Sequence, residues 1–91
     1  MAVHSLRRGK AEAIEAIAHG DESSSKVIGR GVRDIPFPSG TGVGAIVRNE
    51  EVIIPNAETI IEPEDHVIIF MDDKACIQDV EALFQVAVTF I

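Results

Sequence analysis

The aliphatic side chains of this sequence are almost all branched at the β-carbon. Val and Ile together number 23, whereas Leu occurs only at Leu6 and Leu83, and fifteen of the 23 lie between Val27 and Ile69. Branching at Cβ favours extended backbone and restricts side-chain rotamers in a helix. The middle of the chain is therefore predicted to form a sheet, with helices at its two ends.

Length and charge limit what such a sheet domain can do. The 91 residues have room for one small core, and the formal net charge is −7. Residues 1–33 carry 6 basic and 4 acidic groups, and residues 34–91 carry 2 basic and 11 acidic groups. This acidic part would repel phosphates, so neither nucleic acid nor direct lipid binding is expected. A single Cys excludes an intrachain disulfide and suits a reducing compartment.

The N-terminal quarter is predicted to be a connector helix followed by a polar loop. From Leu6 to His19, five apolar residues share one helical face, and Gly20 suits the residue that ends a helix. Residues 21–25 have turn composition. We therefore divide the chain into a connector, 1–25, and a sheet domain, 26–91.

Short strands and one helix are predicted for the rest of the chain. Asn49 suits the turn of a β-hairpin, and Asp72 or Asp73 is expected to cap a helix over 74–84. The predicted strands are Lys26–Gly29, Val43–Val47, Val52–Ile54, Thr59–Ile61 and a central His66–Met71. The result is an α+β fold with a mainly antiparallel sheet of about four to five strands.

Apolar residues alternate strictly in the C-terminal tail, at Phe84, Val86, Val88 and Phe90. Alternation with a period of two is typical of a strand. The tail from Gln85 to Ile91 is therefore interpreted as a pairing or packing segment, within the chain or with a partner.

Three patterns resemble catalytic or nucleotide-binding motifs, and each has a plainer interpretation. The spacing of Gly40–Ala45 fits a dinucleotide loop, but prolines precede it and β-branched residues follow it, so a turn and close strand packing are favoured. Cys76 lies on the apolar face of the predicted helix, where a small buried hydrophobic residue is more common than a nucleophile. His4, His19 and His66 have no metal-ligand spacing. Enzyme activity is not expected, and an enzyme using Cys76 is kept as a rival hypothesis.

An acidic rim includes residues that would suit a divalent cation if the fold brought them together. Its members lack the spacing of a calcium loop, so a solvated rim and a helix cap are favoured. They are Glu62, Glu64, Asp65, Asp72 and Asp73.

From Lys26 onward the sequence resembles the C-terminal domain of regulators of potassium conductance (the RCK-C, or TrkA-C, module). The resemblance rests on K-V-I-G, D-I-P-F-P-S-G, G-A-I-V-R-N-E-E-V-I-I-P and E-P-E-D-H-V-I-I-F, followed by a helix ending in L-F. It covers roughly residues 26–84, and Arg48, Pro55 and Asp65 occupy hallmark positions. Glu50 and Glu64 stand where the family usually has Gly.

The resemblance implies a non-catalytic regulatory and assembly module of a bacterial potassium-uptake transporter. It implies that residues 1–91 belong to a longer chain whose nucleotide-binding domains lie upstream, with no cofactor held in this segment. The expected partners are a second copy, an integral-membrane potassium transport subunit and a small regulatory ligand, with Arg48 and Asn56 as candidate ligand-binding residues and no metal site. The expected location is cytoplasmic, at the inner face of the membrane through that subunit. The alternative is a stand-alone sensing domain of another transporter or regulator, for a small molecule or a divalent cation.

Overall fold

Five antiparallel strands form one sheet, and a C-terminal helix lies against it. The computed structural model describes residues 2–6 and 11–86. The strands are β1 (Ala2–Leu6), β2 (Ala11–Ile17), β3 (Thr41–Arg48), β4 (Glu51–Ile53) and β5 (His66–Met71), in the spatial order β1-β2-β5-β3-β4. The antiparallel α+β prediction is confirmed, and β5 is the central strand as predicted. None of the described helices has the length and apolar character needed to cross a bilayer.

The helix predicted over Leu6–His19 is wrong, because residues 11–17 form β2. This strand pairs with β5 along its length, from Glu12 opposite Met71 to Ile17 opposite His66. Its residues alternate between half-buried and buried, and the even-numbered residues Glu12, Ile14 and Ala16 are the buried ones. The segment fits both a helical and a two-residue period, and pairing with the apolar β5 outweighs the helix propensity of its alanines. Residues 11–17 thus share a sheet with the domain that was predicted to begin at residue 26.

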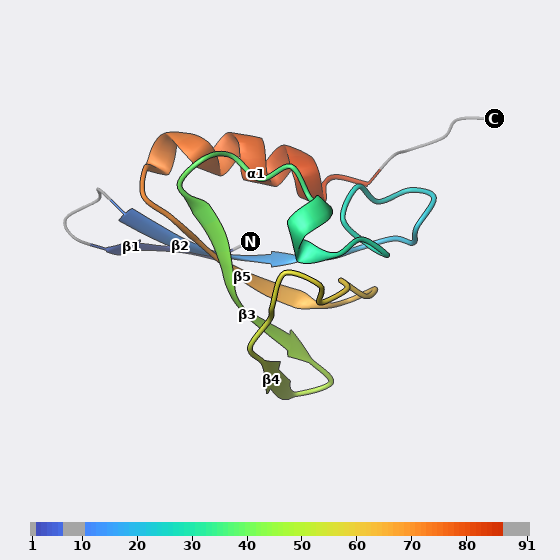
Figure 1. Ribbon diagram of the computed structural model, residues 1–91. Coiled ribbons are helices and arrows are strands. Elements are labelled where there is room, and N and C mark those ends of the chain that lie inside the picture. The colour runs from blue at the N-terminus through green and yellow to red at the C-terminus, as the bar shows by residue number, and fades with distance from the viewer. Residues whose placement is uncertain (1, 7–10, 87–91) are drawn as a thin grey trace.

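The predicted hairpin is confirmed as β3 and β4, joined by a two-residue turn. Arg48 pairs with Glu51, and the turn residues Asn49 and Glu50 have φ angles of 51° and 68°. Positive φ at both central positions is the geometry that matches the twist of a β-hairpin. Asn adopts this conformation readily, whereas Glu does so with strain. The hairpin extends away from the helix (Figure 1).

The glycine-rich segment Gly40–Ala45 belongs to a turn and to β3, as favoured from the sequence. No helix follows it, since β3 continues to Arg48. A Cβ at Gly44 would collide with the Phe70 ring, so the missing side chain at Gly44 leaves room for this ring beside β3. The register between β3 and β5 shifts between Val43 and Ala45, which marks a β-bulge at this contact.

The C-terminal helix is confirmed, as a 3-10 turn over Lys74–Cys76 followed by α1 (Ile77–Phe84). Asp73 caps it by accepting a hydrogen bond from the Ala75 N–H at 2.9 Å. Val80, on the side of α1 that faces the sheet, is completely buried. The core lies between α1 and one face of the sheet and comprises Ile14, Ala16, Ala18, Val27, Ile28, Ile35, Ile46, Ile61, Val67, Ile69, Met71 and Val80.

The strand predicted over Lys26–Gly29 is wrong, although its apolar residues do enter the core. Val27 and Ile28 are buried within a turn in which the Arg30 N–H bonds to the Val27 carbonyl. Gly29 has a φ of 82°, which ends any extended run there. Downstream, Ile60 of the predicted Thr59–Ile61 stretch forms only an isolated bridge with Gly31. Burial, rather than strand pairing, explains the β-branched residues of the 26–29 segment.

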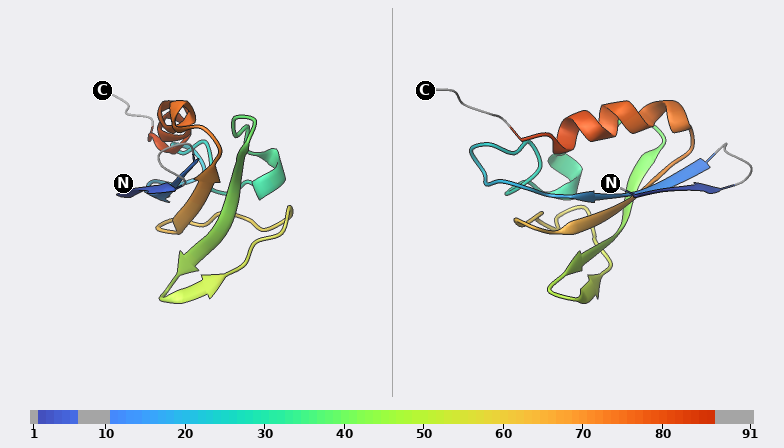
Figure 2. Two further views of the ribbon diagram at one scale, coloured as in Figure 1. Left: turned by 90° about the vertical axis from the view of Figure 1, so that its left-hand side faces the viewer. Right: turned by 180° about the vertical axis from the view of Figure 1, so that it is seen from behind.

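The helix lies on one side of the sheet only (Figure 2). On the other side, Phe70 of β5 is 47% exposed and Val52 of β4 is 66% exposed. Val52 pairs with Val47, which in turn pairs with His66, so these three side chains share the face of Phe70. We call this the open face, defined by Val47, Val52, His66, Ile68 and Phe70.

Replacing Glu50 with Gly is expected to stabilise the domain. The substitution removes the strain of a left-handed Glu, and the larger entropy of Gly in the unfolded chain offsets part of this gain, leaving on the order of 0.5 kcal/mol. Urea unfolding measures the difference. The matched control is Glu51→Gly next door in β4, which should destabilise by roughly 0.5 kcal/mol because Gly weakens a strand. Destabilisation by Glu50→Gly would contradict the strained turn.

Candidate functional site

A side-chain ion pair joins Arg48 at the end of β3 to Asp65 just before β5. The Arg48 Nε donates to Asp65 Oδ1 at 2.9 Å, and Nη2 donates to Asp65 Oδ2 at 2.7 Å. This is a two-pronged guanidinium–carboxylate pair, which fixes orientation as well as charge. Asp65 is completely buried, whereas 23% of the Arg48 side chain is exposed.

Two further groups on the loop before β5 contact the same guanidinium. Arg48 Nη2 donates to the Ile60 carbonyl at 3.0 Å, and Nη1 lies 2.7 Å from Glu62 Oε2. The Glu62 N–H also donates to Asp65 Oδ2 at 2.8 Å. Three hydrogen bonds and the ion pair with Glu62 thus hold the 60–65 loop against the hairpin.

The surroundings of this pair determine its charge state. Burial raises the pKa of Asp65, but hydrogen bonds from Arg48 and the Glu62 N–H, together with the Arg48 charge, outweigh burial and lower that pKa below its ordinary value. The hydrogen bond to Asp65 raises the pKa of Arg48. Both groups therefore stay charged at neutral pH, and the pair is an ionic lock rather than a proton-transfer device.

The second candidate residue, Asn56, lies in an exposed turn after β4. Its side-chain oxygen accepts from the Glu58 N–H at 2.8 Å, and its own N–H donates to Thr59 Oγ1 at 3.0 Å. The amide nitrogen of its side chain has no contact among the described hydrogen bonds. Both residues therefore act on the connection between β4 and β5. Arg48 holds its 60–65 loop in place, and Asn56 shapes the turn just after β4.

The structure divides the acidic rim. Glu62 and Asp65 belong to the Arg48 site, Asp73 caps the C-terminal helix, and Asp72 packs beside Gly40 at the other end of β5. Across residues 2–6 and 11–86 there is no group of three or more His, Cys, Asp or Glu placed to hold a metal ion. Cys76 is half-buried at the start of α1 and packs against the core.

Sequence reasoning missed two histidine–carboxylate pairs that join β2 to the β5 region. His19 Nδ1 lies 3.5 Å from Glu64 Oε1, and His66 Nδ1 lies 3.6 Å from Glu15 Oε2. These pairs could not be predicted because residues 6–19 were expected to form a helix, and only the pairing of β2 with β5 brings Glu15 close to His66. The role of Glu62 beside Arg48 was also missed, although its place in the Glu62–Asp65 turn was a usable cue.

The sequence matches one domain family and several curated proteins. The TrkA-C domain family model matches residues 21–85. The Trk system potassium uptake protein TrkA of Halomonas elongata is 62% identical over 88 residues, which cover 97% of this chain and 19% of that protein. TrkA of Vibrio alginolyticus is 63% identical over 83 residues, covering 91% of this chain and 18% of that protein. The chain thus spans about a fifth of the length of these curated relatives.

Solved structures share the fold at low sequence identity. A chain described as "Structure of RCK domain with cda" superposes with a TM-score of 0.63 at 19% identity, covering 80% of this chain and 97% of its own. A chain of S. agalactiae BusR, solved in complex with its busA-promotor DNA, gives a TM-score of 0.66 at 20% identity and covers 89% of this chain and 40% of its own. At these identities the likeness concerns the fold alone.

Substituting Asp65 with Asn should destabilise the domain and remove part of its acid sensitivity. The substitution removes the buried carboxylate that pairs with Arg48 and leaves the exposed Glu62 as the ionic partner of the guanidinium, which should lower the unfolding free energy by on the order of 3 kcal/mol. Since the folded pKa of Asp65 is depressed, its stabilisation is present above the ordinary Asp value of about 3.9 and is lost as pH falls through the lower folded value. Urea unfolding from pH 7 to pH 2 should therefore show the gap between wild type and Asp65→Asn closing in acid.

The companion variant is Arg48→Lys, which keeps the positive charge but loses the two-pronged geometry. We expect an intermediate loss of stability. A gap between wild type and Asp65→Asn that stays constant down to pH 2 would contradict the ionic lock.

Proposed function

Because the chain belongs to the TrkA-C domain family, we propose that it is a regulatory domain of a bacterial potassium-uptake protein. The observation that carries this proposal is the similarity to two TrkA proteins across nearly the whole chain. We propose that the domain acts without catalysis, by binding other protein surfaces. Its ionic lock then serves to hold the hairpin and the 60–65 loop in one shape.

Assembly of two copies is the part of this proposal that the surface supports. The open face presents Phe70 and Val52, both exposed, beside the half-buried Val47 and Ile68. The Glu15 carboxylate lies 3.6 Å from the His66 ring on the same side of the sheet. An exposed apolar face of this kind is covered when a second copy packs against it about a two-fold axis. The proposed partner on this face is a second copy.

The larger setting follows from the relatives rather than from this domain. We propose a cytoplasmic location, with attachment to a membrane transport subunit through protein contacts. The strongly acidic 34–91 segment disfavours direct contact with anionic lipid and with nucleic acid. In this proposal, nucleotide binding belongs to other domains of the longer protein.

Exchange of domains tests the regulatory role. In Vibrio alginolyticus TrkA, this chain replaces the matching segment, and potassium uptake is measured in cells lacking their own TrkA. We expect uptake to be restored, and a parallel protein with the segment deleted should restore none. Uptake that remains at the level of the deletion would contradict the proposal.

The same chimera tests the open face. Phe70→Glu places a charge on that face and should reduce uptake, while the exposed helix substitution Gln78→Glu should not. Sedimentation of the isolated domain provides the physical readout. We expect wild type and Gln78→Glu to dimerise and Phe70→Glu to be monomeric. A wild-type monomer at high concentration would contradict assembly through this face.

Ligand sensing at Arg48 and Asn56 stays a prediction, and thermal unfolding separates it from assembly alone. A nucleotide or divalent cation that binds the folded domain raises its melting temperature. We expect such a rise in wild type and its loss in Asn56→Ala, with each variant compared with its own melting temperature without ligand because the substitution also removes a turn hydrogen bond. A flat response to every nucleotide and cation would leave assembly as the only role.

A further inference from the structure

A histidine on the open face lines a cavity together with three carboxylates. His66 begins β5, and its Nδ1 lies 3.6 Å from Glu15 Oε2 on β2. A cavity of about 380 Å³ adjoins this pair. The residues that line it are Glu15, Val47, Asn49, Glu50, Glu64 and His66. The strand β2, the hairpin turn and the loop before β5 thus each place one carboxylate around the cavity that His66 lines.

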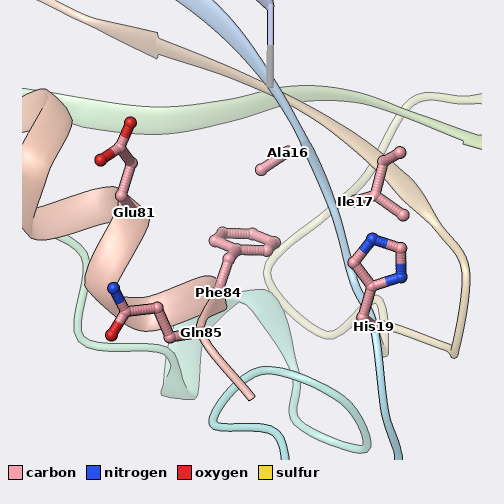
Figure 3. A pocket seen from close by; sticks show the side chains of 6 residues that line it. All are labelled: Ala16, Ile17, His19, Glu81, Phe84 and Gln85. Atoms are coloured by element: carbon pink, nitrogen blue, oxygen red, sulfur yellow. The ribbon is translucent and has the colours of Figure 1, made fainter.

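The other charged groups near His66 already have partners. Asp65 precedes it in the chain, and the Asp65 carboxylate lies 2.7 Å from the Arg48 guanidinium. His19 pairs with Glu64 at 3.5 Å, and both of these side chains are mostly exposed. The His19 ring lines a different cavity, between β2 and the end of α1 (Figure 3). His66 is therefore the one basic side chain among the residues that line the cavity on the open face.

The charge around this cavity changes with pH through His66. The ordinary pKa of a histidine side chain is about 6.5, so a histidine gains its positive charge just below neutral pH. The three carboxylates are opposed by no positive charge in the cavity wall when the ring is neutral, and by one when it is protonated. Val47 and His66 belong both to this cavity and to the open face, so two copies that meet through that face bring their acidic walls together. Like charges repel, and each proton taken up lowers the repulsion between the two copies.

We propose that proton uptake by His66 strengthens the pairing of two copies through the open face. The protonated ring lies next to Glu15, and a second copy that covers this pair excludes water and strengthens the attraction within it. Because the dimer favours the protonated ring, its dissociation constant decreases as the pH falls through the ordinary histidine value and increases again as the pH rises. This inference rests on the proposed assembly through the open face and adds the regulation of that assembly by protons.

Sedimentation of the 91-residue chain at pH 6 and pH 8, at low ionic strength to limit screening, tests the proposal. Wild type should dimerise about tenfold more tightly at pH 6, because each of the two imidazoles favours the dimer by about threefold when it is protonated. His66→Gln should dimerise at both pH values as weakly as wild type does at pH 8. The matched control is His19→Gln, which removes the other histidine paired with a carboxylate and should keep the wild-type pH dependence.

Glu15→Gln provides the converse test, since it removes one negative charge from each face. This variant should dimerise more tightly than wild type at pH 8 and change less between the two pH values. A wild-type dimer with the same dissociation constant at both pH values, or a pH dependence that His66→Gln retains, would overturn this inference and leave assembly standing. A wild-type chain that stays monomeric at both pH values would overturn this inference and the proposed assembly together.

Discussion

A buried carboxylate that must be paired determines how one end of this domain is built. Asp65 is completely buried, and an isolated charge there would be strongly destabilising. Arg48, at the end of β3, pairs with that carboxylate. The same guanidinium also contacts the Ile60 carbonyl and Glu62. The Asp65 carbonyl accepts from Ala18 just after β2. One ionic pair thus sets the positions of the hairpin, the loop before β5 and the end of β2.

The strained backbone positions lie next to the Arg48–Asp65 pair. The described residues with positive φ other than glycine are Asn49, Glu50 and Glu64. Asn49 and Glu50 directly follow Arg48, and Glu64 directly precedes Asp65. The resemblance identified Glu50 and Glu64 as positions where relatives usually have Gly, and the left-handed φ at both is the physical reason for that preference. Strained turns persist where neighbouring contacts over-determine them, which the Arg48–Asp65 pair does here.

The helix covers one face of the sheet and leaves the other face exposed. Beneath α1, the aliphatic residues of β2, β3 and β5 form a closed core. The open face lacks this cover. A domain of this size buries a modest fraction of its surface, so cover of this face by a second copy is physically useful.

Features that depend on local chemistry are the ones that the amino-acid sequence predicts correctly. The β3–β4 hairpin, the apolar central strand and the Asp73-capped helix each rest on a signal within a few residues. Arg48 and Asp65 are recognisable as hallmark positions, but their mutual bond is not, since 17 residues separate them. The helix predicted around Ile14 is wrong because the apolar spacing of an Ala-rich segment fits both a helix and a strand. The strand predicted around Val27 is wrong because a pair of β-branched residues can also be buried in a turn.

An acidic, β-rich domain follows from the amino-acid sequence alone, because β-branching, turn residues and charge act locally, and the motifs from Lys26 onward add its resemblance to the TrkA-C family. Tertiary contacts were needed to establish that residues 11–17 are a strand, that Val27 and Ile28 are buried in a turn, and that Arg48 neutralises Asp65. Each of those outcomes depends on a partner distant in sequence. For residues 11–17, the energy of pairing with β5 exceeds the local helix preference.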